Sequence, residues 1–169
     1  MCSGKTTLGR ALACRLGIDF VDLDEEIEHS ACRSISRIFA EDGEAAFRRL
    51  ESDVLDDVIA RYGTDCAVIA VGGGTPCHGT NMERMSAAGT TVHLVTTVDR
   101  IVERLEIGRD ARPLVADKTA GELRRFVVDA LIDRTPFYDR AAAVFDSTFL
   151  ENTEQVAASV DRFINIFAL

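Results

Sequence analysis

The chain alternates between short runs of apolar residues and longer stretches in which apolar residues recur every three or four positions. The short runs predict buried β-strands over 19–22, 66–71, 90–95 and 142–146. The longer stretches predict helices over 5–16, 24–29, 34–43, 44–62, from about 96 to 105, 122–133 and 153–167. Strands that alternate with helices in this way predict an α/β fold with a parallel sheet.

Capping residues mark the ends of several predicted helices. Gly17 follows the first helix and Gly63 follows the longest one, where glycine accommodates the conformation that ends a helix. Asp24 and Ser34 are expected to cap the two helices that start at them, because carboxylate and hydroxyl oxygens accept the free N–H groups there.

The stretch 106–119 is polar and charged, and it predicts a mobile loop or lid. Elsewhere the sequence shows no linker, no internal repeat and no low-complexity segment. A length of 169 residues therefore predicts a single domain, 1–169, with a hydrophobic core of its own.

The composition favours a globular protein and disfavours a membrane-spanning or nucleic-acid-binding one. Hydrophobic residues make up 47% of the chain and charged residues 28%, which is typical of globular proteins. No apolar run approaches the roughly 18 residues of a membrane-spanning helix, and no signal peptide pattern is present, so a cytoplasmic location is expected. The net charge of −9 disfavours nucleic-acid and anionic-membrane partners. The five cysteines form no C-x-x-C pair and are expected to be reduced thiols.

Residues 1–7, Met-Cys-Ser-Gly-Lys-Thr-Thr, form the second half of a phosphate-binding loop, G-x-x-x-x-G-K-[ST]. Consecutive backbone N–H groups of such a loop point at one phosphate, and the dipole of the following helix favours the anion. Gly4 permits close approach of the backbone, Lys5 is expected to reach the β- and γ-phosphates, and Thr6 is expected to hold Mg²⁺. Further ATP contacts are expected from Cys2, Ser3 and Thr7.

The first glycine of this motif, and the strand that leads into it, would lie before Met1. Such a strand is central in the sheet, and its loss removes roughly five apolar side chains worth about 1.5–3 kcal/mol each. Because a domain is stabilised by only about 5–15 kcal/mol, the 169-residue chain is expected to fold poorly or to leave a gap in its sheet. A misassigned start codon or a gene fragment would account for roughly ten missing residues.

A second group of polar residues suggests a site for a small acid that carries hydroxyl groups. Asp22 and Asp24 follow a predicted strand, where ligand sites of α/β proteins gather. Arg48 and Glu51 are three residues apart on a predicted helix and therefore face the same way. Together with Arg134, these groups could bind a carboxylate through guanidinium forks and hydroxyls through an aspartate. The alternative for each arginine is a surface salt bridge.

Three successive glycines, Gly72, Gly73 and Gly74, follow the strand 66–71. Glycines without side chains would bring backbone N–H groups close to the same ligand. The residues alone thus indicate a small-molecule kinase whose acceptor is a polyhydroxy acid.

Five ordered segments together resemble the shikimate kinases. They are F-V-D-L-D-E-E-I-E (20–28), F-R-R-L-E (47–51), V-G-G-G-T-P (71–76), A-R-P-L (111–114) and R-T-P-F-Y (134–138). The resemblance implies phosphorylation of the 3-hydroxyl of shikimate by ATP, giving shikimate 3-phosphate and ADP in the aromatic biosynthetic pathway. It implies a three-layer α/β/α fold with strand order 2-3-1-4-5, whose first strand is largely missing here, and a cytoplasmic monomer.

The resemblance also implies roles for individual residues. Catalytic roles fall on Lys5, Asp24 and Arg112, with Asp24 orienting the attacking hydroxyl and Arg112 closing over the phosphates from the lid. Shikimate contacts, within a binding region of about 24–52 and beyond it, fall on Asp24, Arg48, Gly72, Gly73, Gly74 and Arg134. Magnesium contacts fall on Thr6 and Asp22, and Glu51 braces Arg48.

The match to the family pattern is incomplete in the lid, at the adenine contacts and at Cys2. Both Arg109 and Arg112 could be the lid arginine, and the proline that follows favours Arg112. Arg104 could be the arginine that packs on adenine, while the segment 149–152 before the last helix lacks a basic pattern. Cys2 stands where the family has glycine, either as an inert small residue or as an oxidisable thiol.

Two other functions stay open on the sequence alone. One is another small-molecule kinase of this fold, such as a gluconate kinase, against which the set of aspartate, arginines and glycines argues. The other is a nucleotide-binding remnant or regulatory module without turnover, which the incomplete phosphate-binding loop would favour.

Overall fold

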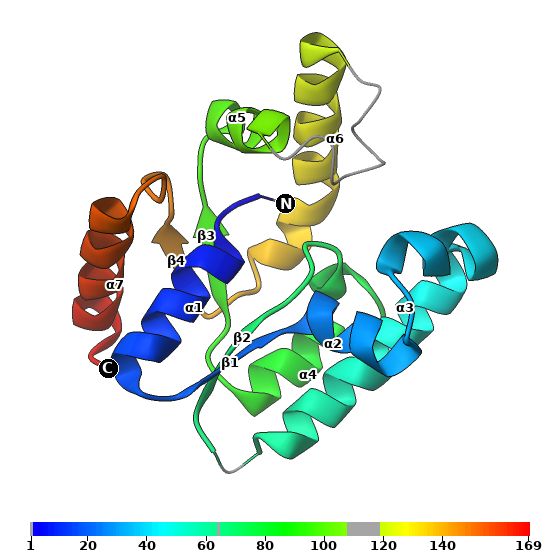
Figure 1. Cartoon of the computed structure of the whole chain (residues 1–169), viewed down its shortest axis with the longest axis horizontal. Helices are drawn as coiled ribbons and strands as arrows, with labels where there is room; N and C mark the ends of the chain where they lie inside the picture. Colours follow the sequence, from blue (N-terminus) through cyan, green and yellow to red (C-terminus); the bar gives the residue numbers. More distant parts are fainter. Residues whose placement is uncertain (1, 64, 108–118) are drawn as a thin grey trace.

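Helices and strands alternate along the chain as predicted. The computed structural model describes residues 2–63, 65–107 and 119–169. In chain order the elements are α1 (Lys5–Leu16), β1 (Asp19–Asp22), α2 (Leu23–Ala31), α3 (Ile35–Arg61), β2 (Ala67–Ala70), the 3₁₀ helix η1 (Thr75–Cys77), α4 (Asn81–Ala88), β3 (Val92–Val95), α5 (Val98–Ile107), α6 (Ala120–Tyr138), β4 (Ala143–Asp146) and α7 (Thr153–Phe167) (Figure 1). The bounds of α1, β1 and α7 are those that the hydrophobic pattern predicts.

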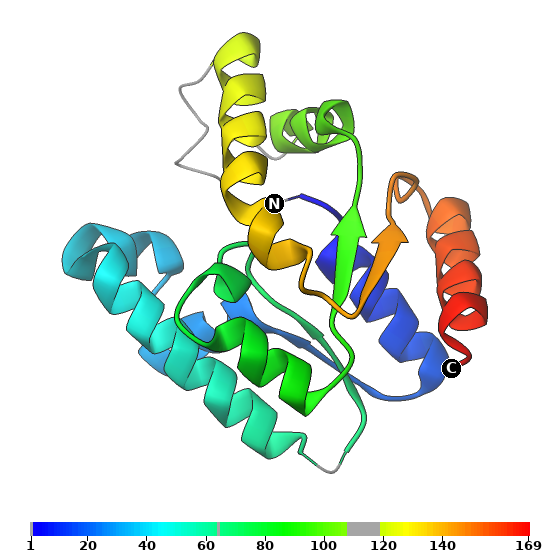
Figure 2. The same cartoon turned by 180° about the vertical axis from the view of Figure 1, so that it is seen from behind.

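The strands form the middle of three layers. Successive residues of a strand point to opposite faces of the sheet. Val68 of β2 packs with α1 and α7, whereas Ile69 packs with α3 and α4. On the α1 side the fit is close, because a Cβ atom on Gly9 would lie 2.8 Å from Cε2 of Phe20 in β1. Helices α1 and α7 therefore cover one face and α3 and α4 the other (Figures 1 and 2), which confirms the predicted three-layer α/β/α arrangement.

The four strands form two separate parallel pairs. β1 pairs with β2 from Asp19 opposite Ala67, and β3 pairs with β4 from Val92 opposite Ala143. Within the described residues no strand joins β2 to β3. The pairs correspond to strands 2-3 and 4-5 of the predicted order, so the expected gap in the middle of the sheet is confirmed.

A cavity of about 370 Å³ lies between the two strand pairs. One wall is formed by Ile69 of β2 and by Val71, which follows β2, and the other by Val92 and Leu94 of β3. Helices α3 and α4 close its floor, and Lys5 lies in its lining. The inner edges of β2 and β3 are thus bordered by a space with apolar walls, which is the environment of a buried parallel strand.

Two predicted helix boundaries were wrong at residues that matter for the site. The cap of α2 is Asp22 instead of Asp24, since the Asp22 side chain accepts a hydrogen bond from the Asp24 N–H at 3.1 Å. Helix α6 continues past the predicted end at Asp133 to Tyr138, with Pro136 inside it. A proline in the last turn removes only one N–H donor, and the Thr135 hydroxyl bonds the Leu131 carbonyl at 2.7 Å.

The predicted break in the long helical stretch is confirmed at Gly43, whose φ of 78° and ψ of 172° interrupt α3. The Ser34 cap is confirmed as well. Helices η1 and α4 were not predicted, because three glycines precede η1 and Pro76 lies within it, which masks the helical spacing.

The predicted lid lies mostly at 108–118, outside the described residues. Of the remainder, Glu106 and Ile107 belong to α5, and Thr119 caps α6 with Glu122 in a reciprocal pair of hydrogen bonds. Among the described helices, none combines the length and the apolar character needed to cross a membrane.

The cavity between the strand pairs leads to a stability prediction. A peptide extension of about ten residues before Met1, with about five apolar residues followed by the missing Gly-x of the loop, should fill the cavity and pair with both β2 and β3. We expect the free energy of unfolding to rise by several kcal/mol, at about 1.5–3 kcal/mol for each buried side chain. Urea unfolding monitored by circular dichroism measures this, with an extension of equal length rich in Ser and Lys as the control. Equal stability of the two extended chains would contradict the interpretation.

Candidate functional site

The start of α1 presents a turn of backbone N–H groups. Gly4, the N-cap of α1, has φ 89° and ψ 18°, and Lys5 is the first helical residue. Cys2 also has positive φ, at 47°, in the position where the family resemblance expects glycine. A residue in the left-handed backbone conformation next to one in the right-handed conformation forms a concave turn of N–H groups that binds anions. The dipole of the following helix adds to the attraction for the anion. Residues 2–6 therefore have the geometry of a phosphate-binding loop.

The carboxyl ends of the strands meet at this loop. From β1, the Asp22 Oδ2 atom accepts a hydrogen bond from the Thr6 hydroxyl at 2.8 Å. From the end of β4, the Ser147 hydroxyl donates to the Ser3 carbonyl at 2.7 Å. Ligand sites of parallel α/β sheets form outside the carboxyl ends of the strands, so the loop stands where the fold places ligands.

Asp22 fixes two neighbouring groups at once. Its Oδ1 atom accepts from the Asp24 N–H, which caps α2, while its Oδ2 atom holds the Thr6 hydroxyl. A hydroxyl and a carboxylate oxygen 2.8 Å apart suit Mg²⁺, which prefers oxygen ligands and takes few of them from the protein. The two residues predicted to hold the metal are thus brought together.

Asp24 and Lys5 lie near each other, and each affects the protonation of the other. Partial loss of hydration raises the pKa of Asp24, the Asp22 charge adds to the rise, and Lys5 opposes it. Burial lowers the pKa of Lys5, while Asp24 is the strongest of the groups that oppose this. The charged forms of Asp24 and Lys5 therefore lose part of their hydration, and shifted pKa values of this kind are common at functional sites.

Arg48 is oriented by two carboxylates on its own helix. Its Nη1 atom lies 2.9 Å from Oε2 of Glu51, and its Nη2 atom lies 3.1 Å from Oε1 of Glu44. The Glu51 side chain is only 1% exposed, so Arg48 compensates a fully buried charge. This confirms that Arg48 and Glu51, three residues apart on α3, face the same way.

A buried network that the sequence analysis missed supports Glu51. The Thr75 hydroxyl donates to the second Glu51 oxygen at 2.6 Å. The Asn81 amide donates to the Thr75 carbonyl at 3.0 Å, and the Ser52 hydroxyl donates to the Asn81 side-chain oxygen at 3.0 Å. Thr75 and Asn81 are almost wholly buried. Both follow the triple glycine closely, which was the only signal in the sequence.

The triple glycine lies directly against the charged residues. A Cβ atom on Gly72 would lie 3.1 Å from Oδ1 of Asp24 and 3.2 Å from Oε1 of Glu51. A Cβ atom on Gly74 would lie 2.7 Å from Nη1 of Arg48. A side chain at position 74 would require the Arg48 guanidinium to move, and one at position 72 would crowd the two carboxylates, so glycine suits this close approach.

Helix α6 brings Arg134 and Tyr138 to the same place. The Tyr138 hydroxyl donates to the Gly73 carbonyl at 2.5 Å and so ties the glycine loop to α6. Burial raises the pKa of Tyr138, and the Arg134 charge opposes the rise. The Arg134 charge also contributes to lowering the pKa of Lys5. Arg134 therefore stands near both the glycine loop and the phosphate-binding loop.

The structure thus gathers the predicted residues of both halves around one site. The residues predicted for the phosphate half lie at the start of α1, and those predicted for the acceptor half lie around the triple glycine: Cys2, Ser3, Gly4, Lys5, Thr6 and Thr7 in the first group, and Asp22, Asp24, Arg48, Gly72, Gly73, Gly74 and Arg134 in the second. Arg112 and Arg109 lie outside the described residues. Tyr138 was noted only as part of a motif, and its contact with Gly73 could not be read from the sequence.

Comparison with known proteins identifies the family. The family model of shikimate kinase matches residues 1–165. A shikimate kinase from Bacteroides thetaiotaomicron is 40% identical over 169 residues, which cover all of this chain and 95% of that protein. The chain belongs to the shikimate kinase family. A shikimate kinase from Azobacteroides pseudotrichonymphae is 43% identical over 145 residues, 86% of this chain and 84% of that protein.

Solved structures of shikimate kinases agree with this assignment. The crystal structure of the Bacteroides thetaiotaomicron shikimate kinase matches with a TM-score of 0.92 and 38% identity, covering all of this chain and 94% of that one. An Acinetobacter baumannii shikimate kinase in complex with shikimate matches with a TM-score of 0.82 and 30% identity, covering 99% of this chain and 89% of that one. The predictions of the family, the enzyme class and the P-loop kinase fold are confirmed, and the gluconate kinase alternative is set aside.

The buried network of this shikimate kinase chain leads to a prediction. Thr75→Val should destabilise the fold by about 1–3 kcal/mol, because one oxygen of the buried Glu51 carboxylate loses its hydroxyl donor. Thr75→Ser keeps the hydroxyl and serves as the matched control. Urea unfolding of the two variants and the parent measures the difference. Equal stability of the Val and Ser variants would show that the Thr75 hydroxyl contributes nothing to the network.

Proposed function

We propose that this chain transfers the γ-phosphoryl group of ATP to the 3-hydroxyl of shikimate, giving shikimate 3-phosphate and ADP. The observation that carries the proposal is the placement of Asp24 and Lys5 at the junction of two half-sites. One half is the phosphate-binding loop, and the other contains Arg48, Arg134 and the triple glycine. The shikimate complex of the Acinetobacter baumannii relative supports the same acceptor.

The phosphate half would act by positioning and charge, because phosphoryl transfer needs little covalent help from the protein. Backbone N–H groups of the loop would bind the phosphates, with further contacts from Cys2, Ser3 and Thr7. The Lys5 ammonium would neutralise charge that develops between the β- and γ-phosphates. Arg112, from the lid at about 106–119, would add charge above the phosphates.

Magnesium is the metal that this arrangement would use. Bound Mg²⁺ bridges phosphate oxygens and neutralises part of their charge. Thr6 and Asp22 would hold it, the hydroxyl directly and the carboxylate directly or through water, since their oxygens already lie 2.8 Å apart.

The acceptor half would bind shikimate by complementary charges. Arg48 and Arg134 would bind its carboxylate through guanidinium forks. Asp24 would accept hydrogen bonds from its hydroxyls and orient the 3-hydroxyl toward the γ-phosphate. The backbone of Gly72, Gly73 and Gly74 would border the ring. In the transfer, the bond between the γ-phosphorus and the ADP oxygen would break as the bond to the 3-oxygen forms, and the hydroxyl proton would pass to the Asp24 carboxylate that accepts its hydrogen bond.

The proposal also concerns the extent of the domain, the oligomeric state and the location of the protein. A single domain over 1–169, with the shikimate-binding region at about 24–52, fits the way these residues converge. A monomeric state and a cytoplasmic location remain predictions.

A coupled assay for ADP release tests the proposal. We expect turnover that depends on both shikimate and Mg²⁺. Lys5→Met and Asp24→Asn should each lower kcat/KM at least about a hundredfold, the loss typical of removing one group that stabilises the transition state. Asp56→Asn is the matched control, because Asp56 is an exposed partner of Arg84 on the surface. Nucleotide binding without any shikimate-dependent ADP release would instead favour the alternative of a binding module.

The pH dependence of activity follows from the shifted pKa values of Asp24 and Lys5. Asp24 must be a carboxylate to accept from shikimate, and its pKa is raised by burial and by Asp22. The rate should therefore rise with pH through a value above that of an ordinary aspartate. Lys5 must be cationic, and burial lowers its pKa, so the rate should fall on the basic side earlier than for an exposed lysine. Plots of kcat/KM for shikimate against pH measure both limbs, and an acid limb at the ordinary aspartate value would contradict the role of Asp24.

A further inference from the structure

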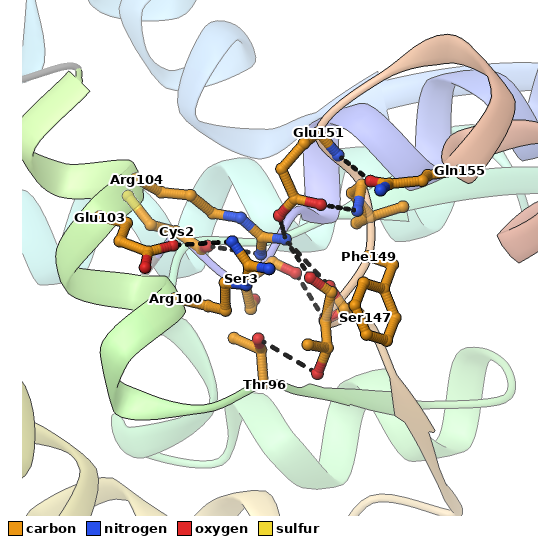
Figure 3. Close-up of polar contacts among 12 residues, drawn as sticks. Cys2, Ser3, Thr96, Arg100, Glu103, Arg104, Ser147, Phe149, Glu151 and Gln155 are labelled. Carbon is orange, nitrogen blue, oxygen red and sulfur yellow. Dashed lines mark hydrogen bonds and ion pairs between the residues drawn. The ribbon is translucent and has the colours of Figure 1, made fainter.

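Arg104 of α5 lies at the meeting point of two segments that are distant in the sequence. Its side chain is only 17% exposed. Its Nη1 atom donates to the Cys2 carbonyl at 3.3 Å, and its Nη2 atom donates to the Ser147 and Thr148 carbonyls at 3.2 and 3.0 Å (Figure 3). The same Nη2 atom lies 3.0 Å from Oε1 of Glu151. One guanidinium therefore connects the phosphate-binding loop to segment 147–151.

Two more contacts join the same segments at the next two residues of the loop. Ser147 is fully buried, and its hydroxyl donates to the Ser3 carbonyl at 2.7 Å. Leu150 covers Gly4 so closely that a Cβ atom there would lie 2.3 Å from Cδ1 of Leu150. Segment 147–151 thus contacts Ser3 and Gly4 directly, and Arg104 links the same segment to Cys2.

The orientation of the two held carbonyls decides where the loop's donors point. A peptide unit is planar and trans, so its N–H points away from its C=O. Arg104 holds the Cys2 carbonyl toward segment 147–151, and Ser147 does the same for the Ser3 carbonyl. The N–H groups of Ser3 and Gly4 belong to these two peptide units. They must therefore face the opposite side, where the phosphates of a nucleotide would bind.

Arg104 also acts on a residue with an unfavourable backbone conformation. Cys2 has φ 47°, a region that residues with a Cβ atom seldom adopt. The hydrogen bond to its carbonyl helps to hold this conformation. A lysine at position 104 could not replace all of these hydrogen bonds. Its single ammonium lacks the planar, two-armed guanidinium that reaches both the Cys2 carbonyl and the acceptors of segment 147–151.

We propose that Arg104 is a positioning residue of the nucleotide site, which orients the peptide units of the phosphate-binding loop so that their N–H groups face the phosphates. The inference rests on the proposed function for the identity of the nucleotide. It differs from the role that the family resemblance suggested for Arg104, packing on adenine. Positioning acts on the phosphate end of the nucleotide, whereas packing acts on the base.

Separate probes for the two ends of ATP test the proposal. Isothermal titration would measure the binding of tripolyphosphate with Mg²⁺, and of adenosine, to the folded chain and its variants. Arg104→Met should weaken tripolyphosphate binding about tenfold or more, the loss of hydrogen bonds from a charged group, and leave adenosine binding within about twofold. Arg104→Lys keeps the charge and should show an intermediate loss, which separates positioning from simple attraction.

Two further variants complete the experiment. Arg100→Met is the matched control, because it removes a cation from the same helix whose ion pair is with Glu103 at 2.8 Å, and it should leave both probes unchanged. Ser147→Ala removes the hydroxyl bonded to the Ser3 carbonyl without changing any charge, and should selectively weaken tripolyphosphate. It also keeps the test decisive if Arg104→Met does not fold.

The proposal is overturned by any of three results. These are unchanged tripolyphosphate affinity in the Arg104 and Ser147 variants, a loss confined to adenosine, and an equal loss of both probes. None of these measurements requires turnover. A failure of the parent chain to phosphorylate shikimate would therefore contradict the proposed function and leave the positioning role standing on its own result.

Discussion

Helix α1 must hold the two strand pairs together, and the rest of the structure depends on this. β2 and β3 do not pair within the described residues, so hydrogen bonds of the sheet do not connect the halves. On one half, Gly9 lies against Phe20 and Val68. On the other, Leu8 and Leu12 join the cluster formed with β4 and α7. Because the phosphate-binding loop leads directly into α1, the packing that unites the halves also fixes the loop.

The acceptor half of the site depends on a different device, a buried carboxylate with all its partners in place. Burying a charge such as Glu51 is costly unless donors replace its water. Arg48 and Thr75 supply them, and Asn81 and Ser52 hold Thr75 in turn. The result is a guanidinium held in one orientation before any ligand arrives. Such preorganisation reduces the entropy that binding would otherwise cost.

Sequence patterns predicted those features that depend on local chemistry. Strand β1 and helices α1 and α7 have the predicted bounds, because apolar periodicity and capping residues depend on neighbours only a few positions away. The prediction was wrong where an interaction between distant residues decided the outcome. Asp22 caps α2 while its other oxygen accepts from Thr6, and α6 continues past Pro136 to Tyr138, whose hydroxyl reaches the Gly73 carbonyl. A motif predicts which residues form the site, but the Thr75 and Asn81 contacts follow only from tertiary packing.

The site is built for anions although the chain carries a net charge of −9. Burial lowers the pKa of Lys5, which means that the nearby aspartates do not fully replace the water its ammonium loses. The Asp22 carboxylate also accepts hydrogen bonds from the Thr6 hydroxyl and the Asp24 N–H. A phosphate placed at the start of α1 would supply the missing partner for Lys5, as a helix N-terminus favours. Substrate charge would thus complete an electrostatic arrangement that the protein alone leaves unbalanced, which couples binding to the alignment of the reacting groups.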